Sequence, residues 1–284
     1  MTAFGLGELP GTDLVKAAEI VVGESPTPHI PQLPDRGLGS DLIGRTAALL
    51  DIPIDRGPRS WRVATQHRAA KDQMARDLDV LEEVWAGQVS EVKVQLVGPW
   101  TLAARIEMAN GHRMITDPGA LRDVTDALRE AIGAHRADVE KRFGARTILQ
   151  LDEPALPDVM QGRLPGATDF ETIRAVPEPH ERLSLFDAHL LHTTALVDAD
   201  WLTVDVAALD AAGKDRVAAL LENGTRLAIA PEEPKRVLRF LDELQIDPAA
   251  TTVDVYAEPA ATLVGTAANY RAAREMAEAL IVGL

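Results

Sequence analysis

The sequence contains no cysteine, and this absence excludes a defined set of chemistries. Disulfide bonds, thiol nucleophiles and metal sites built on thiolates all need cysteine sulfur. The absence also agrees with a cytoplasmic location, where disulfides are rare, although a secreted protein without disulfides would have the same composition. Any site in this chain must therefore be built without thiolate ligands.

Long apolar runs and an excess of basic residues are also missing. No segment approaches the roughly 18 uninterrupted apolar residues of a membrane span. Residues 1–11 lack the basic and then apolar pattern of a secretion signal. The formal net charge of -15 argues against nucleic acid and anionic membranes as partners, because both attract clustered Lys and Arg. We expect a cytoplasmic protein that acts on a small-molecule substrate, with no nucleic acid and no membrane as partner.

Short runs rich in Val, Ile, Leu and Thr alternate along the chain with segments of helical periodicity. Strands are predicted at residues 3–6, 61–65, 92–97, 147–151, 190–192, 202–205, 226–229 and 253–256. Helices are predicted at residues 13–22, 41–50, 68–85, 121–142, 214–223, 233–244 and 267–281. This alternation is typical of repeated βα units.

Eight βα units predict an α/β protein with one (β/α)8 TIM barrel as a single domain over residues 1–284. An open doubly wound sheet would use fewer strands, and no G-x-G-x-x-G follows the first strand. Neither a nicotinamide nor a flavin cofactor is therefore expected. Residues 23–59 are rich in proline and lack strand patterning, which indicates either a functional lid or an excursion from the barrel.

Polar residues at the predicted strand ends are the candidates for chemistry, because barrel enzymes build their sites there. Asp152 and Glu153 follow one strand, and strand alternation directs them to opposite faces. Asp152 could bind an ammonium group or transfer a proton, or it could cap a helix beginning near Pro154. His192 is a candidate ligand or acid–base group as well as a possible structural residue. Trp100 could stack on a planar ligand or belong to the core.

Three motifs carry a resemblance to a known family. They are Gly7-Glu8-Leu9-Pro10-Gly11-Thr12, Gly98-Pro99-Trp100-Thr101 and Gln150-Leu151-Asp152-Glu153-Pro154-Ala155-Leu156. In this order they resemble the catalytic barrel of cobalamin-independent methionine synthase, and more closely its short single-barrel form. The resemblance spans nearly the whole chain and implies methyl transfer to the thiol of a homocysteine-like acceptor, a step of methionine biosynthesis, from a donor that stays unknown.

The same resemblance implies a zinc site and a substrate site. The family's zinc is held by a histidine, two cysteines and a glutamate. The histidine matches His192 and the glutamate matches Asp205, whereas the cysteines fall at Thr194 and Ala261, so the zinc site is expected to be degenerate. The implied catalytic residues are His192 and Asp152. The implied substrate-binding residues are Glu8, Asp152, Glu153 and Trp100.

Three functions remain open from the sequence. The first is a methyltransferase of the methionine synthase type, and the second is a catalytically inactive barrel that binds a ligand or regulates a partner. The third is a metal-free reaction similar to that of uroporphyrinogen decarboxylase, with Arg36, Arg45 and Arg62 holding an acidic substrate. Metal content and the convergence of His192 with Asp205 distinguish the first from the others.

Overall fold

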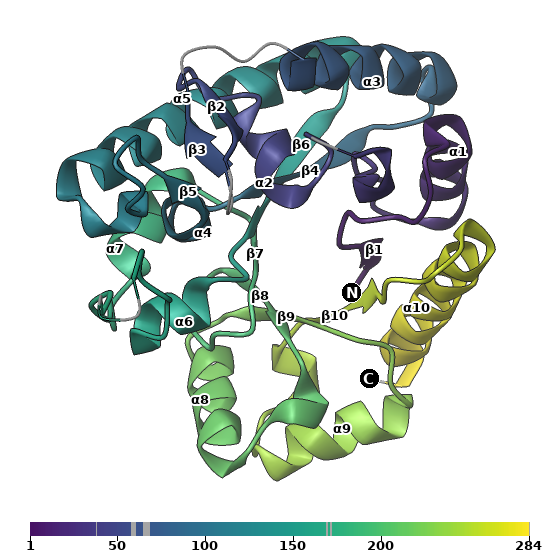
Figure 1. Cartoon of the computed structure of the whole chain (residues 1–284). Coiled ribbons are helices and arrows are strands. Elements are labelled where there is room, and N and C mark those ends of the chain that lie inside the picture. Colours follow the sequence, from purple (N-terminus) through teal and green to yellow (C-terminus); the bar gives the residue numbers. More distant parts are fainter. Residues whose placement is uncertain (38, 58–60, 65–68, 169, 171, 284) are drawn as a thin grey trace.

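The protein is a curled parallel sheet surrounded by helices (Figure 1). A computed structural model describes residues 1–284 except 38, 58–60, 65–68, 169, 171 and 284. Seven strands pair in parallel in the order β1 (Ala3–Gly5), β10 (Val253–Ala257), β9 (Arg226–Ile229), β8 (Trp201–Val204), β7 (Leu190–His192), β6 (Arg146–Asp152) and β4 (Glu91–Val97). The predicted α/β barrel architecture is confirmed.

The helices of the described chain begin and end at the residues that favour helix termini. Aspartates 13, 41, 117 and 210 accept bonds from backbone N–H groups at four helix starts, and Gly144 ends the longest helix in the left-handed region. No described helix combines the length and apolar composition needed to cross a membrane. The helices are α1 (Leu14–Glu24), α2 (Leu42–Ala47), α3 (Ala69–Trp85), α4 (Pro99–Arg105), α5 (Pro118–Phe143), α6 (Leu156–Gln161), α7 (His180–Leu183), α8 (Ala211–Glu222), α9 (Pro234–Glu243) and α10 (Leu263–Gly283).

The strand predicted at residues 61–65 does not join the seven-stranded sheet, so its predicted place in the barrel is wrong. Its described part, β3 (Trp61–Val63), pairs instead with β2 (Ile54–Arg56) and β5 (Ile106–Glu107) in a separate sheet. Residue 65 lies outside the described residues. Residues 61–63 do form a strand, as predicted, but this strand belongs to the small side sheet.

Residues 27–32, inside the proline-rich stretch, take the vacant position between the edge strands β1 and β4. Thr27 bridges Phe4 and His29 bridges Lys93, both in parallel. The N–H of Ile30 donates to the Lys93 carbonyl at 3.1 Å, and the N–H of Lys93 donates to the Pro28 carbonyl at 2.8 Å. The prolines at 28 and 31 have no N–H, so this segment cannot form a regular ladder and does not show strand patterning.

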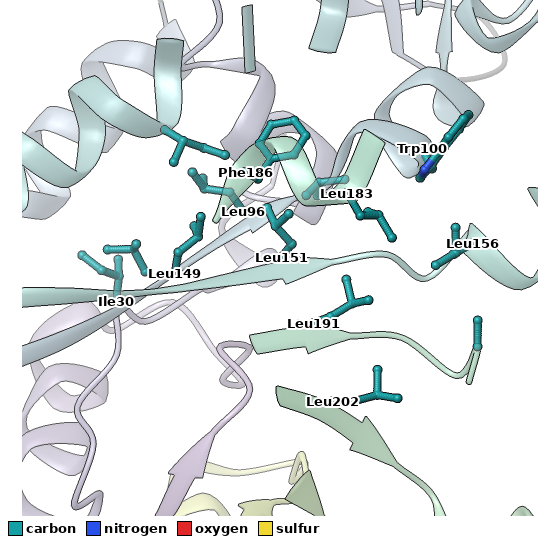
Figure 2. Close-up of a cluster of buried hydrophobic side chains, with 14 of the residues drawn as sticks. Ile30, Leu96, Trp100, Leu149, Leu151, Leu156, Leu183, Phe186, Leu191 and Leu202 are labelled. Carbon is teal, nitrogen blue, oxygen red and sulfur yellow. The ribbon is translucent and has the colours of Figure 1, made fainter. Parts of the chain in front are cut away.

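Alternation along the strands separates two apolar clusters. Leu149, Leu151, Leu191 and Leu202 face the helices in the larger cluster, which Figure 2 shows beside Phe186. The residues of opposite parity point into the ring, where Phe4, Leu190, Trp201 and Ala228 form a small second cluster. Lys93, Gln95, Gln150 and His29 are also buried, so the ring interior has an apolar part and a polar part.

We expect Ile30→Ala to lower the free energy of unfolding by about 2–4 kcal/mol, because Ile30 is 2% exposed and its removal leaves a cavity. Denaturant unfolding measures the change. Val264→Ala, at a position that is 81% exposed, is the matched control and should change stability by no more than about 0.5 kcal/mol. Equal effects of the two substitutions would show that residues 27–32 do not pack as part of the core.

Candidate functional site

A pocket of about 170 Å³ opens at the carboxyl ends of the strands, the usual position of a barrel enzyme's site. It is formed where the chain leaves β1, β6, β7 and β10, and residues from α2 and α10 complete its wall. The lining residues are Leu6, Glu8, Gln32, Leu42, Asp152, Pro154, His192, Ala257, Glu258, Pro259, Thr266 and Tyr270.

Asp152 sits at the end of β6 and is tied to a lysine deeper in the ring. The ammonium group of Lys93 donates to the side-chain oxygen of Gln150. The amide nitrogen of Gln150 donates to Asp152 Oδ1 at 2.6 Å and to the Leu6 carbonyl at 2.8 Å. Because Lys93 is fully buried, this chain of bonds offsets part of the cost of removing its charge from water.

Burial shifts both ends of this chain toward neutrality. Burial raises the pKa of the Asp152 carboxyl to about 7, while the positive charge of Lys93 and the hydrogen bond from Gln150 act in the opposite direction. Burial lowers the pKa of the Lys93 ammonium to about 7, and the charge of Asp152 opposes that shift. The charge state of each group therefore depends on that of the other near neutral pH.

A second branch of the network reaches α10. With the Gln95 amide oriented to satisfy its neighbours, its oxygen accepts from His29 Nδ1 at 3.0 Å and from Lys93 Nζ at 3.2 Å. His29 Nε2 then accepts from the Tyr270 hydroxyl at 2.6 Å. Gly5 leaves room for this contact, because a Cβ there would lie 2.2 Å from the Tyr270 oxygen.

His192 lines the same pocket from the end of β7. Its Nδ1 lies 3.0 Å from Thr203 Oγ1, and the Thr203 hydroxyl itself donates to the Thr193 carbonyl. The hydrogen between the first pair therefore belongs to Nδ1, which leaves Nε2 as an acceptor. Burial lowers the pKa of His192 to about 4, and the nearby charge of Lys93 adds to this shift.

Of the residues proposed from the sequence, Asp152, His192 and Glu8 come together in the pocket. Asp152 is not a helix cap, since the residue at the start of α6 is Ala155 and no side chain caps it. The structure places Glu153 and Trp100 outside the pocket lining.

Glu153 anchors the start of α4. Its carboxylate accepts from the Trp100 N–H at 2.9 Å, from the Thr101 N–H at 2.7 Å and from the Thr101 hydroxyl. Gly98 makes this approach possible, because a Cβ there would lie 2.3 Å from Glu153 Oε1. Trp100 is buried, donates from Nε1 to the Pro179 carbonyl at 3.1 Å and packs under Arg182, so its ring is committed to the core.

The residues that the resemblance assigns to zinc do not fit a zinc site. Thr194 and Ala261 offer no thiolate, and both are exposed. Asp205 is exposed and uses Oδ1 to cap the N–H of Ala207 at 3.1 Å. Nowhere in the described chain do three His, Cys, Asp or Glu side chains converge as a metal site requires.

The arginines considered for an acidic substrate are used elsewhere. Arg36 and Arg45 share Asp77, at 2.7 Å and 3.9 Å. Arg62 donates to the carbonyl of Ala109 beside the small side sheet. None of the three arginines lines the pocket.

Sequence reasoning missed Lys93 and Tyr270 as contributors to the site. A signal for Lys93 was present, because Lys93 and Gln95 alternate with Val92, Val94 and Leu96 and so share one face of an otherwise apolar strand. Nothing local marks Tyr270, which reaches the site from the last helix.

The fold and the site together define an α/β barrel with an acidic pocket at the carboxyl ends of its strands. Residues 65–171 match the family described as "Cobalamin-independent synthase, Catalytic domain". A solved structure from Listeria monocytogenes, assigned provisionally as a vitamin-B12-independent methionine synthase, shares the fold with a TM-score of 0.60, at 16% identity over 99% of each chain. No curated protein matches this chain in sequence. The family match covers part of the chain, and the solved structure shows that the fold is shared.

We expect Lys93→Met to raise the pKa of Asp152 by about one unit or more, because the substitution removes a nearby positive charge. In the variant Asp152 stays protonated at a pH where the wild-type carboxyl is ionised. Carbon NMR of aspartate-labelled protein, with Asp152→Asn to assign the signal, follows this titration. Lys141→Met, at an exposed position on α5, is the control. An unchanged Asp152 titration in Lys93→Met would refute the coupling.

Proposed function

We propose that this chain is a methionine synthase-like barrel that binds a small amine-bearing ligand in the strand-end pocket, with Asp152 as the anchor of the ammonium group. The observation that carries the proposal is the position of Asp152. Its side chain is 4% exposed, lines the pocket and is held from behind by Gln150. A carboxylate in this position favours a ligand that brings a positive charge.

Cation binding would give a role to the Asp152 carboxylate, whose burial is energetically unfavourable when it is ionised. Burial alone favours the neutral acid, whereas an ammonium group in contact with Asp152 favours the ionised form. Gln150 fixes one oxygen of the carboxylate and so sets the direction of the other. This arrangement supports recognition of a charged group and requires no reaction.

The changed zinc positions favour binding over the chemistry of the family. In that chemistry zinc holds the acceptor sulfur as a thiolate, which raises its reactivity near neutral pH. Here an alcohol and a methyl group replace two thiolates, and the remaining carboxylate faces solvent. Of the positions that the resemblance assigns, Glu8 and Asp152 line the pocket, whereas Thr194 and Ala261 supply no thiolate.

Calorimetric titration of the whole chain tests this proposal with two ligands, 3-(methylthio)propylamine and methionine, which share an amine and a thioether. We expect at least one to bind, and Asp152→Asn to weaken it by about tenfold or more. Asp215→Asn, an exposed change on α8, is the control and should bind as the wild type does. Circular dichroism verifies that each variant is folded. Binding that does not change in folded Asp152→Asn would contradict the proposal, and so would the absence of binding by both ligands.

Methyl transfer to a homocysteine-like thiol is the second candidate, favoured by the presence of Asp152 and His192 in one pocket. An assay with labelled methyltetrahydrofolate, homocysteine and added zinc tests it. Because two ligand positions lack thiolates, we expect no labelled methionine above the level of a reaction without protein. Transfer that requires Asp152 would instead establish a methyltransferase.

A further inference from the structure

We infer that the ligand of this pocket is a small primary amine with an aliphatic body and no carboxylate or phosphate beside its ammonium group. The inference rests on the proposed function and narrows it to one class of ligand. It would separate this protein from a synthase whose acceptor is an α-amino acid.

The charges around the pocket have one sign. Carboxylates of Glu8, Asp152 and Glu258 line it, and they come from three different strand ends. No lysine or arginine is among its lining residues, all of which the structure describes. The buried cation Lys93 is not a lining residue and donates to Gln150. An anionic group entering the pocket would meet like charges and find no partner of opposite sign.

Most hydrogen-bond donors of the lining side chains are already in use. The Tyr270 hydroxyl donates to His29, and the Thr266 hydroxyl donates to the Thr262 carbonyl. One N–H of the Gln32 amide donates to the backbone carbonyl of Gln95, and His192 Nδ1 is held by Thr203. A carboxylate or phosphate needs such donors, so the pocket offers it little.

Several N–H groups at helix starts near the pocket, another common source of donors for anions, are bonded within the protein. At the start of α6 the Ala155 N–H donates to Thr101 Oγ1 at 3.1 Å, and the Leu156 N–H donates to the Glu153 carbonyl. At the start of α10 the Gly265 N–H donates to Thr262 Oγ1 at 3.1 Å. The N–H groups of Trp100 and Thr101 on α4 are taken by Glu153.

The polar atoms that remain open are acceptors. Gln150 occupies Asp152 Oδ1, and no donor among the described residues reaches Oδ2, although the side chain is 4% exposed and lines the pocket. His192, which also lines the pocket, has a second acceptor, Nε2, that no described donor reaches. The three hydrogens and positive charge of a primary ammonium suit acceptors of this kind.

The rest of the wall is apolar and fits the body of such a ligand. Leu6 and Leu42 face the pocket together with Pro154, Ala257 and Pro259. A volume of about 170 Å³ limits the ligand to a small molecule. The walls therefore suit a short hydrocarbon or thioether chain that extends from the ammonium group.

Three ligands that differ only in their charged groups test the inference by calorimetry on the whole chain. They are 3-(methylthio)propylamine, methionine and 4-(methylthio)butanoate, which carry the amine alone, the amine with the carboxylate, and the carboxylate alone. We expect the amine to bind about tenfold or more tightly than methionine, and the butanoate not to bind. Methionine binding equal to or tighter than that of the amine would overturn the inference.

Substitution of Glu8 and Glu258 tests whether their carboxylates cause the preference for the amine over methionine. In Glu8→Gln combined with Glu258→Gln the preference for the amine over methionine should shrink by about threefold or more. Glu222→Gln, at an exposed position on α8, is the matched control and should leave the preference unchanged. An undiminished preference in the double variant would refute the role of these carboxylates.

The proposed function and the inference fail in different ways. Methionine binding that is at least as tight as amine binding and is lost in Asp152→Asn overturns the inference and leaves the proposed function standing. Amine binding that is unaffected in folded Asp152→Asn overturns the proposed function itself.

Discussion

A lysine buried inside the ring is the constraint on which the polar half of this barrel depends. Lys93 has no contact with solvent, so its charge must be met by oxygen atoms within the protein. Gln150 and Gln95 supply those oxygens, and each then uses its remaining polar capacity on a neighbour. The hydrogen bonds around the Lys93 ammonium therefore connect β4 and β6 with residues 27–32. The bond between His29 and Tyr270 extends this network to α10.

The same network determines the character of the pocket above it. The donors of Gln150 and Tyr270 are used within the network, so they do not serve a ligand. Asp152 and His192 remain as open acceptors, and Glu8 and Glu258 add negative charge near them. The charge of the pocket therefore depends on which side chains the strand ends carry, because neighbouring strand ends place these side chains side by side.

The strands of the seven-stranded sheet could be predicted from the sequence, whereas the segment that pairs with its two edge strands could not. Residues 190–192 and 226–229 were located to the residue because short apolar runs with clear ends form β7 and β9. Residues 27–32 were missed because two prolines remove the N–H groups of a regular strand. Neighbouring chain on both sides supplies the bonds that hold this segment, and no local pattern encodes those bonds.

By itself the sequence determined that no thiolate site can exist, since composition alone settles which side chains are available. Its two-residue alternation also directed Asp152 and Glu153 to opposite sides of β6. Only the tertiary structure decided that Glu8, Asp152 and Glu258 line one pocket, and that Asp205 faces solvent. The physical reason is that parallel strands deliver distant residues to one end of the ring, while the burial and partners of each depend on what packs around it.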